Sequence, residues 1–224
     1  MKKISFIALA LSTSLGMYAQ NNQNVTPMAI APRFGIKAGV NLAKLRPSAF
    51  SSAEEPSTNL KTTAHAGAFV NIPLSTGGFA IQPEIVYSRQ GSKVSQKTTV
   101  GTITSTSSYE QDLDYINVPI MLQWKSAGGF FVETGPQAGF LIKGQQEGPG
   151  TNSETNNKES FDKMDVSWGA GLGFLSRIGL GIGARYNHGF RNIKNDESTT
   201  TTQYGALRNS VVNIGLAWHF GAGK

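Results

Sequence analysis

Residues 165–187 read Asp165-Val-Ser-Trp-Gly-Ala-Gly-Leu-Gly-Phe174, Leu-Ser-Arg, then Ile178-Gly-Leu-Gly-Ile-Gly-Ala-Arg-Tyr-Asn187. In both halves apolar residues alternate with glycine or polar residues, which is the period of a β-strand with two unlike faces. Only a short junction at Ser176 and Arg177 separates the halves. The sequence therefore predicts two antiparallel strands joined by a tight turn.

The same alternation recurs along the whole chain after residue 33. It predicts eight strands over residues 34–42, 64–72, 79–88, 115–124, 130–143, 165–174, 178–187 and 211–220. Each is close to the length of about 9 to 11 residues that a tilted membrane strand needs. We therefore expect an all-β fold, a closed eight-stranded antiparallel up-and-down transmembrane β-barrel.

The connections between these strands alternate in length. Short junctions lie at 75–78, 125–129 and 176–177, and long segments rich in Ser, Thr, Asn and Gly lie at 43–61, 91–110, 144–162 and 192–206. Outer-membrane barrels have short periplasmic turns and longer extracellular loops. We therefore expect both termini in the periplasm. The low-complexity runs Thr98–Ser108, Thr151–Ser160 and Ser198–Thr202 are expected to be mobile, because they have few apolar residues to bury.

The first residues have the pattern of an export signal, with Lys2 and Lys3 before an apolar stretch and Ala19 at a plausible cleavage point. This divides the chain into a signal peptide at 1–19, a periplasmic linker at 20–32 and a barrel domain at 33–224. Cysteine is absent, which excludes disulfides, thiolate metal sites and a lipoprotein anchor. The net charge of +6 falls to +4 when Lys2 and Lys3 are removed, and the remaining cations are scattered, so no nucleic-acid partner is expected.

Alternation alone does not say which face meets lipid, and a soluble calyx with the faces reversed is the structural alternative. The polar face is crowded with glycine, which suits a narrow lumen. The apolar face has the large rings, which we expect to form two aromatic girdles at the membrane interfaces. The girdle residues are Phe34, Phe79, Trp124, Phe130, Phe174 and Trp218 near the periplasmic end and Tyr87, Phe140, Trp168 and Tyr186 near the other, together with Phe220.

Five charged residues fall on the predicted inner face: Lys37, Glu84, Glu133, Arg185 and Arg191. An unpaired charge there would be costly, so these residues should pair across the lumen and close it. Prolines fall inside four predicted strands, at Pro73, Pro83, Pro119 and Pro136. Because proline cannot donate to a strand ladder, we expect bulges or strand ends at these positions.

Five segments follow one another in a recognisable order: Phe34-Gly-Ile-Lys-Ala-Gly-Val-Asn41, Ile81-Gln-Pro-Glu-Ile-Val-Tyr-Ser-Arg-Gln-Gly91, Tyr115-Ile-Asn-Val-Pro-Ile-Met-Leu122, Val132-Glu-Thr-Gly-Pro-Gln-Ala-Gly139 and Arg185-Tyr-Asn-His-Gly-Phe190. In this order they resemble the PorT-like outer-membrane β-barrel family of Bacteroidetes, over essentially the whole mature chain. The resemblance implies an outer-membrane barrel and allows a part in protein secretion. It implies no catalytic residue.

Three classes of function follow. The first is a non-enzymatic barrel with a plugged polar lumen and a structural or surface-interaction role, and the second is an accessory component of a secretion or transport complex. The third, a lipid or peptide hydrolase, would need a base such as His188 beside Ser167, but the spacing shows no triad. His65, His188 and His219 lie on different strands and two faces, so neither a metal nor a cofactor is expected. The expected partners are outer-membrane lipid and lipopolysaccharide, the outer-membrane assembly machinery and envelope or secretion-complex proteins.

Overall fold

The structure is a computed structural model that describes residues 31–47, 57–74, 77–100, 103–147, 154–156, 158–193 and 206–221. The predicted signal peptide and nearly all of the predicted linker lie outside these residues. Within them, no helix is both long enough and apolar enough to cross a membrane.

Eight long strands make up the described chain. They are β1 (Arg33–Pro47), β3 (Lys61–Pro73), β4 (Phe79–Val100), β5 (Ile103–Lys125), β6 (Phe130–Glu147), β8 (Met164–Leu175), β9 (Leu180–Gly189) and β10 (Leu207–His219). Two three-residue strands, β2 (Ser57–Asn59) and β7 (Glu154–Asn156), and one 3₁₀ turn, η1 (Lys158–Ser160), lie near one end of the barrel.

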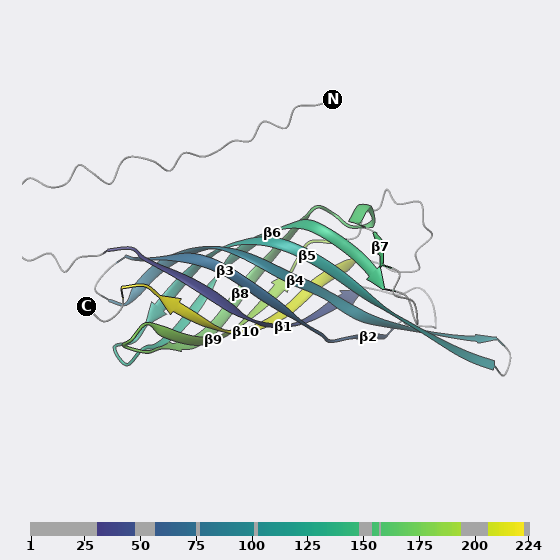
Figure 1. The fold of residues 1–224 in the computed structure, drawn as a ribbon, viewed down its shortest axis with the longest axis horizontal. Coiled ribbons are helices and arrows are strands. Elements are labelled where there is room, and N and C mark those ends of the chain that lie inside the picture. The colour runs from purple at the N-terminus through teal and green to yellow at the C-terminus, as the bar shows by residue number, and fades with distance from the viewer. Residues whose placement is uncertain are drawn as a thin grey trace, which may run out of the picture.

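The long strands pair in the ring order β4-β3-β1-β10-β9-β8-β6-β5, and pairing of β4 with β5 closes it. All of these pairings are antiparallel, and the strands run obliquely around the barrel (Figure 1). The start of β1 lies beside the end of β10, where Gly35 faces His219. The predicted closed eight-stranded antiparallel barrel is confirmed.

The apolar face of the strands lies on the outside of the barrel. Leu172 is 55% exposed and Ile182 56%, whereas the inward-facing Met121 is 0% and Glu84 is 4%. A water-soluble protein does not expose so large a continuous apolar surface, but a barrel in hydrocarbon requires it. The alternative of a soluble calyx is therefore wrong.

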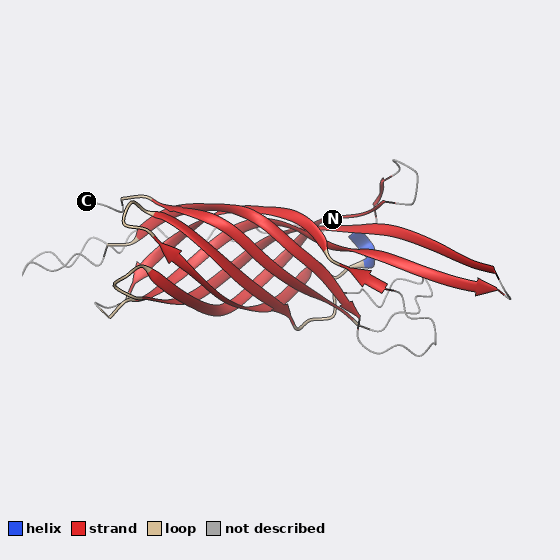
Figure 2. Cartoon of the chain, turned by 90° about the horizontal axis from the view of Figure 1, so that it is seen from below, coloured by secondary structure: helices blue, strands red, loops and turns tan. Residues whose placement is uncertain are grey.

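The β4–β5 hairpin differs most from the prediction. Residues 91–110 were expected to form a long loop, but β4 runs for 22 residues and β5 for 23, and they stay paired as far as Val100 and Ile103. The hairpin projects well beyond the end of the barrel (Figure 2). Threonine and valine favour strands, and a partner strand satisfies the backbone groups that a loop would leave to water. Residues 98–100 and 103–108 of the predicted mobile loop are thus paired β-strands.

The other two low-complexity runs extend beyond the described residues. Part of Thr151–Ser160 forms β7 and η1, whereas Ser198–Thr202 lies wholly outside the described ranges. At the opposite end of the barrel the connections are tight. Gly129 donates to the carbonyl of Ser126 at 3.0 Å and Gly179 to that of Ser176 at 3.1 Å. Both glycines have positive φ, 95° and 92°, which suits glycine at a hairpin turn. Hence β9 begins at Leu180 and not at residue 178.

The prolines interrupt the ladder without changing the register. Pro73 ends β3, as predicted. Each of the other three lies where the pairing between two neighbouring strands is skipped and then resumes in the same register: Pro83, Pro119 and Pro136. The expected irregularity is present at these three positions, as a local interruption of the ladder and not as a bulge. The register shift between β5 and β6 occurs instead at Asp114 and Tyr115.

Candidate functional site: the lumen and the loop end of the barrel

Four of the predicted lumen charges form one layer across the barrel. Lys37 lies on β1, Glu84 on β4, Glu133 on β6 and Arg185 on β9. In the ring order these are every second strand, so β4 and β9 are diametrically opposed, as are β1 and β6. Inward residues of alternate strands meet at one level of a barrel. Two cations and two carboxylates therefore meet at the axis, and their formal charges cancel.

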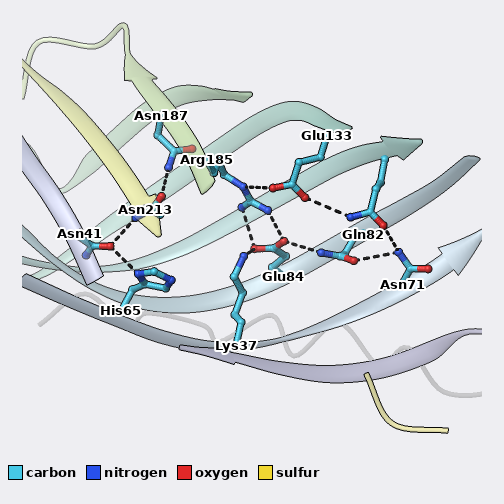
Figure 3. A network of polar contacts seen from close by, with 11 residues as sticks. Lys37, Asn41, His65, Asn71, Gln82, Glu84, Glu133, Arg185, Asn187 and Asn213 are labelled. Atoms are coloured by element: carbon cyan, nitrogen blue, oxygen red, sulfur yellow. Dashed lines mark hydrogen bonds and ion pairs between the residues drawn. The ribbon is translucent and has the colours of Figure 1, made fainter. Parts of the chain in front are cut away.

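Contacts within this charge layer are short. Arg185 donates through Nη2 to Glu84 Oε1 at 2.7 Å, through Nη1 to Glu84 Oε2 at 3.0 Å and through Nε to Glu133 Oε1 at 2.7 Å. Lys37 Nζ lies 3.1 Å from Glu84 Oε2. The Glu84 side chain is 0% exposed. This is the fork geometry in which arginine binds carboxylates most strongly (Figure 3).

Neutral amides extend the network along the lumen. On one side Gln82 donates to Glu84 at 2.9 Å, and Asn71 donates to Gln82 at 3.0 Å. On the other side Asn213 donates to Asn41 Oδ1 at 2.6 Å, and His65 Nδ1 contacts the same oxygen at 2.7 Å. Figure 3 shows the Gln82 and Asn71 arm joined to Glu84, whereas the Asn41, His65 and Asn213 group lies beside the charge layer as a cluster of its own. Buried polar groups of this kind are tolerable only when they are hydrogen-bonded.

Glycine makes the room that this layer needs. A Cβ on Gly171 would lie 3.0 Å from Glu133 Oε1 and 2.8 Å from the carbonyl oxygen of Ala184. Both distances are at or below the closest that real Cβ atoms approach. The Gly-X alternation of β8 therefore clears space for the charged side chains of neighbouring strands.

Arg191 does not belong to the charge layer, and its predicted place there is wrong. It lies after the end of β9, is exposed, and pairs with Asp162 at 3.1 Å. The two-residue period applies only while the strand continues, and β9 ends at Gly189.

A second, apolar layer crosses the barrel at the end from which the β4–β5 hairpin projects, which is called here the loop end. Sequence reasoning missed this layer. It consists of Leu45, Leu113, Tyr115, Leu141, Phe161 and Ile193, with Leu207 packed against it. Leu45, Phe161 and Ile193 were assigned to polar loops. Backbone hydrogen bonds tie these segments together, from Asp162 to Ile193 at 2.7 Å and from Ile193 to Leu207 at 2.8 Å. Isolated large apolar residues in otherwise polar loops were the available signal.

A cavity of about 60 Å³ lies between the charge layer and the end of the barrel that has the short turns. Its lining includes Lys37, His65, Glu133, Arg185 and His219. The described residues contain no group of three or more His, Cys, Asp or Glu placed to hold a metal. The lumen is thus crossed by a charged layer and an apolar layer, and a small cavity lies beside the charged layer.

The candidate catalytic pair is not assembled. Ser167 is buried on the inner side of β8, whereas His188 lies on the outer face of β9, where it pairs with the lipid-facing Trp168. His188 instead contacts the Tyr186 hydroxyl at 3.1 Å and Arg46 at 3.3 Å. A base must reach the proton that it abstracts, so these two residues form no nucleophile and base pair.

An ion-pair cluster joins the projecting hairpin to the barrel. Lys61 Nζ lies 2.8 Å from Glu110 Oε2 and 2.8 Å from Asp112 Oδ2, and Lys93 Nζ lies 2.8 Å from Glu110 Oε1. Hydrogen bonds from Lys61 and Lys93 hold the pKa of Glu110 below its ordinary value. This cluster connects the base of the hairpin to β3.

All of the predicted girdle residues are exposed on the outer surface. Phe79 faces Trp124 and Phe130 faces Phe174 near the short turns. Towards the other end, Tyr87 and Phe140 lie on either side of Ile116 of β5. The indole N–H of Trp168 donates to Thr134 at 2.8 Å, so this polar group is satisfied. Phe220 lies in the turn that follows β10.

A closed antiparallel barrel with an apolar exterior and a polar interior is an integral β-barrel membrane protein. Residues 18–195 match the family model described as "Outer membrane protein beta-barrel domain". This match covers most of the chain, so the chain belongs to that family and is a protein of the outer membrane.

Three solved structures are similar to this chain at low sequence identity. The attachment invasion locus protein Ail of Yersinia pestis is 11% identical with a TM-score of 0.43, covering 84% of this chain and 98% of its own. Neisserial surface protein A is 10% identical with a TM-score of 0.48, covering 84% and 97%. OprG of Pseudomonas aeruginosa is 11% identical with a TM-score of 0.41, covering 85% and 96%. No curated protein matches the chain.

Proposed function

We propose that this chain is a non-enzymatic outer-membrane protein that displays the β4–β5 hairpin at the cell surface for contact with other molecules. The observation that carries this proposal is the length of that hairpin. Its paired residues continue from the lipid-facing Tyr87 through Arg89 and Asp114 to Val100 and Ile103. A strand needs only about 9 to 11 residues to cross the membrane. The rest of β4 and β5 lies beyond the barrel and serves no purpose in spanning it.

The free edges of the ribbon support this role. The edge of β4 pairs with β2 only at residues 93–95, and the edge of β5 pairs with β6 only as far as Glu110. Beyond these points the described chain supplies no further strand to either edge. An exposed strand edge offers backbone donors and acceptors to an incoming strand. A partner that adds a strand is therefore the kind of contact that the hairpin favours.

The closed lumen makes transport through the barrel a poor alternative. The charge layer bridges opposite strands, and the apolar layer lies between it and the loop end. Opening a path would break buried ion pairs, which is costly. We therefore expect no sustained conductance when the purified protein is inserted in a planar bilayer.

The proposed orientation places the short turns and both termini in the periplasm and the hairpin outside the cell. The predicted export signal and the alternation of short and long connections support it. Outer-membrane lipid, lipopolysaccharide and the assembly machinery are then the partners that every such barrel meets. Envelope proteins are the candidates for the hairpin.

A second proposal is that the chain is an accessory component of a secretion complex, which the PorT-like motif order favours. Its contacts would then lie on the periplasmic side, at turns such as Ser126–Gly129. The two proposals therefore place the partner at opposite ends of the barrel.

Photo-crosslinking distinguishes them. A crosslinking amino acid is placed at Ser95 in the hairpin or at Ala127 in the short turn, and adducts are recovered from native membranes. Surface display predicts adducts from Ser95 that are lost when residues 96–107 are replaced by a two-residue turn, while the barrel still folds. Adducts confined to Ala127, unchanged by the shortened hairpin, would favour the secretion role and contradict the first proposal.

A further inference from the structure

Three cations gather on the outer face of the barrel where β1, β10 and β9 approach its loop end. In the register of β1 with β10, Arg46 lies directly opposite Arg208, and Lys44 lies directly opposite Ser210. Ser210 in turn faces His188 of β9. Lys44, Arg46 and Arg208, with Ser210 and His188 beside them, are named here the rim cation cluster.

The rim cation cluster continues the lipid-facing surface. On β1 and β10 the intervening residues Leu45 and Asn209 are buried in the interior, so Lys44, Arg46 and Arg208 point away from it. The apolar residues Leu42 and Val212 face each other on the same outer surface. The three cations are the next one or two outward-facing residues along these strands, towards the loop end. The cations therefore border the apolar band at the depth where lipid headgroups begin.

The two arginines have only neutral partners in the described chain. Arg46 Nη2 donates to the carbonyl oxygen of Gly189 at 3.3 Å and lies 3.3 Å from His188 Nε2, and Arg208 Nε donates to the carbonyl oxygen of Phe190 at 3.1 Å. The buried Nε of Arg46 has no hydrogen-bond acceptor. The eight ion pairs formed by described residues include neither arginine and do not include Lys44.

Three other cations near this end have acidic partners. Arg89 pairs with Asp114 at 2.9 Å, Lys93 with Glu110 at 2.8 Å and Arg191 with Asp162 at 3.1 Å. Like charges directly opposite each other on neighbouring strands are destabilising. An anion supplied from outside the chain would remove the repulsion between Arg46 and Arg208.

Arginine guanidinium groups match phosphate oxygens in charge and in fork geometry. The hydroxyls of Ser210 and Tyr186 are 3.1 Å apart beside the arginines and offer further hydrogen bonds. We propose that the rim cation cluster binds the phosphate of a phosphorylated glycolipid of the outer leaflet, whose acyl chains lie along the apolar face below it. This inference rests on the orientation proposed above, which places this rim at the outer leaflet.

Binding is tested with the folded protein in detergent micelles by native mass spectrometry. The probes are diphosphorylated lipid A, the same lipid without phosphate, phosphatidylglycerol and inorganic phosphate. The variant K44Q/R46Q/R208Q removes the cluster, and K143Q/K158Q/K163Q removes the same charge elsewhere at the loop end. Lysines and arginines near a membrane each contribute appreciably to anionic lipid binding, so we expect a loss of about tenfold or more for the first variant and little change for the second.

The comparison between probes completes the test. Diphosphorylated lipid A should bind more tightly than the dephosphorylated lipid, phosphatidylglycerol or free phosphate. Equal binding of any of these probes, or equal losses in the two triple variants, would overturn the proposal. If the triple variant K44Q/R46Q/R208Q does not show the heat-dependent gel shift of a folded barrel, R208Q alone is used. We expect R208Q to lower the affinity for diphosphorylated lipid A several-fold, and an unchanged affinity would count against the site.

Orientation is measured separately so that its failure is recognisable. The chain contains no cysteine, so S95C and A127C each introduce a single thiol. A membrane-impermeant maleimide applied to intact cells should label S95C and spare A127C. The reverse pattern would refute the orientation, whereas the expected labelling together with unselective lipid binding would refute the lipid site alone.

Discussion

Replacing Glu84 by glutamine tests whether the charge layer holds the barrel together. Glu84 accepts two hydrogen bonds from Arg185, at 2.7 and 3.0 Å, and one from Lys37 at 3.1 Å, while its side chain is 0% exposed. Glutamine keeps the shape of the side chain but not its charge. The layer then changes from two cations and two carboxylates to two cations and one carboxylate, with the excess charge buried at the barrel axis.

The magnitude follows from these contacts. Removing one partner of a buried ion pair costs about 3–5 kcal/mol, because the other charge is left uncompensated. Glu133→Gln is the matched control, because it leaves the same net charge. Glu133 accepts one bond from Arg185 at 2.7 Å and a longer one from Gln123 at 3.4 Å, and Arg185 keeps both bonds to Glu84 in this variant. We expect it to cost about 1.5–3 kcal/mol, the range for one hydrogen bond to a charged group. The double variant K37Q/E84Q restores neutrality and should lose less than Glu84→Gln alone.

The free energy of unfolding is measured by urea titration of the protein folded into phospholipid vesicles, with tryptophan fluorescence as the signal. All three tryptophans lie on the lipid-facing surface, so their emission reports departure from the bilayer. A loss below about 1 kcal/mol for Glu84→Gln would refute the reasoning, because it would place the variant below the range for a broken buried pair. A double variant less stable than Glu84→Gln would refute it too.

Three further perturbations test other parts of the barrel. Ala170→Arg places a charge on the lipid-facing side of β8, away from both interfaces, and should lower the free energy of unfolding by about 2–4 kcal/mol in the same urea titration. Leu180→Arg places the charge at the first residue of β9, near an interface, and should lower it by about 0–1 kcal/mol. Gly171→Leu should prevent the heat-dependent gel shift of the folded barrel, since even a Cβ there would lie 2.8 Å from a backbone oxygen, and normal folding would refute the tight packing. Glu110 has a pKa held below its ordinary value of 4.5, so its contribution to hairpin stability is fully present above that pH and is lost as the pH falls through the lower folded-state pKa. The protection factors of the hairpin amides, which compare their exchange rates with those of an unstructured chain at the same pH, should therefore fall on acidification, and Glu110→Gln should abolish most of this dependence.

The number of long strands, their apolar faces and the short turns were all predictable from local patterns. A two-residue period appears in the sequence of each strand, and a glycine marks the end of turns such as Ser126–Gly129. The membership of the charge layer was predictable in part. Lys37, Glu84, Glu133 and Arg185 all occupy inward-facing positions in the alternation of their strands. Arg191 lies past the end of its strand, where that phase no longer applies.

Composition was a poor guide at the loop end. The Thr- and Ser-rich segment after Gly91 was interpreted as an irregular loop because it has little to bury, yet pairing between β4 and β5 satisfies its backbone to Val100 and Ile103. Leu45, Phe161 and Ile193 each lie alone among polar neighbours in the sequence. Their burial depends on three separate segments meeting over the barrel mouth, which no local pattern records.

The amino-acid sequence alone was sufficient for the class of fold and for the face that each side chain presents, because both follow from residues one or two positions apart. Which residues become partners depended on the closed ring. Closure brings β4 opposite β9, so that Glu84 meets Arg185 although 101 positions separate them, and it sets Arg46 beside Arg208. Such pairings depend on ring order and stagger, which are properties of all the strands together and are encoded in no single one of them.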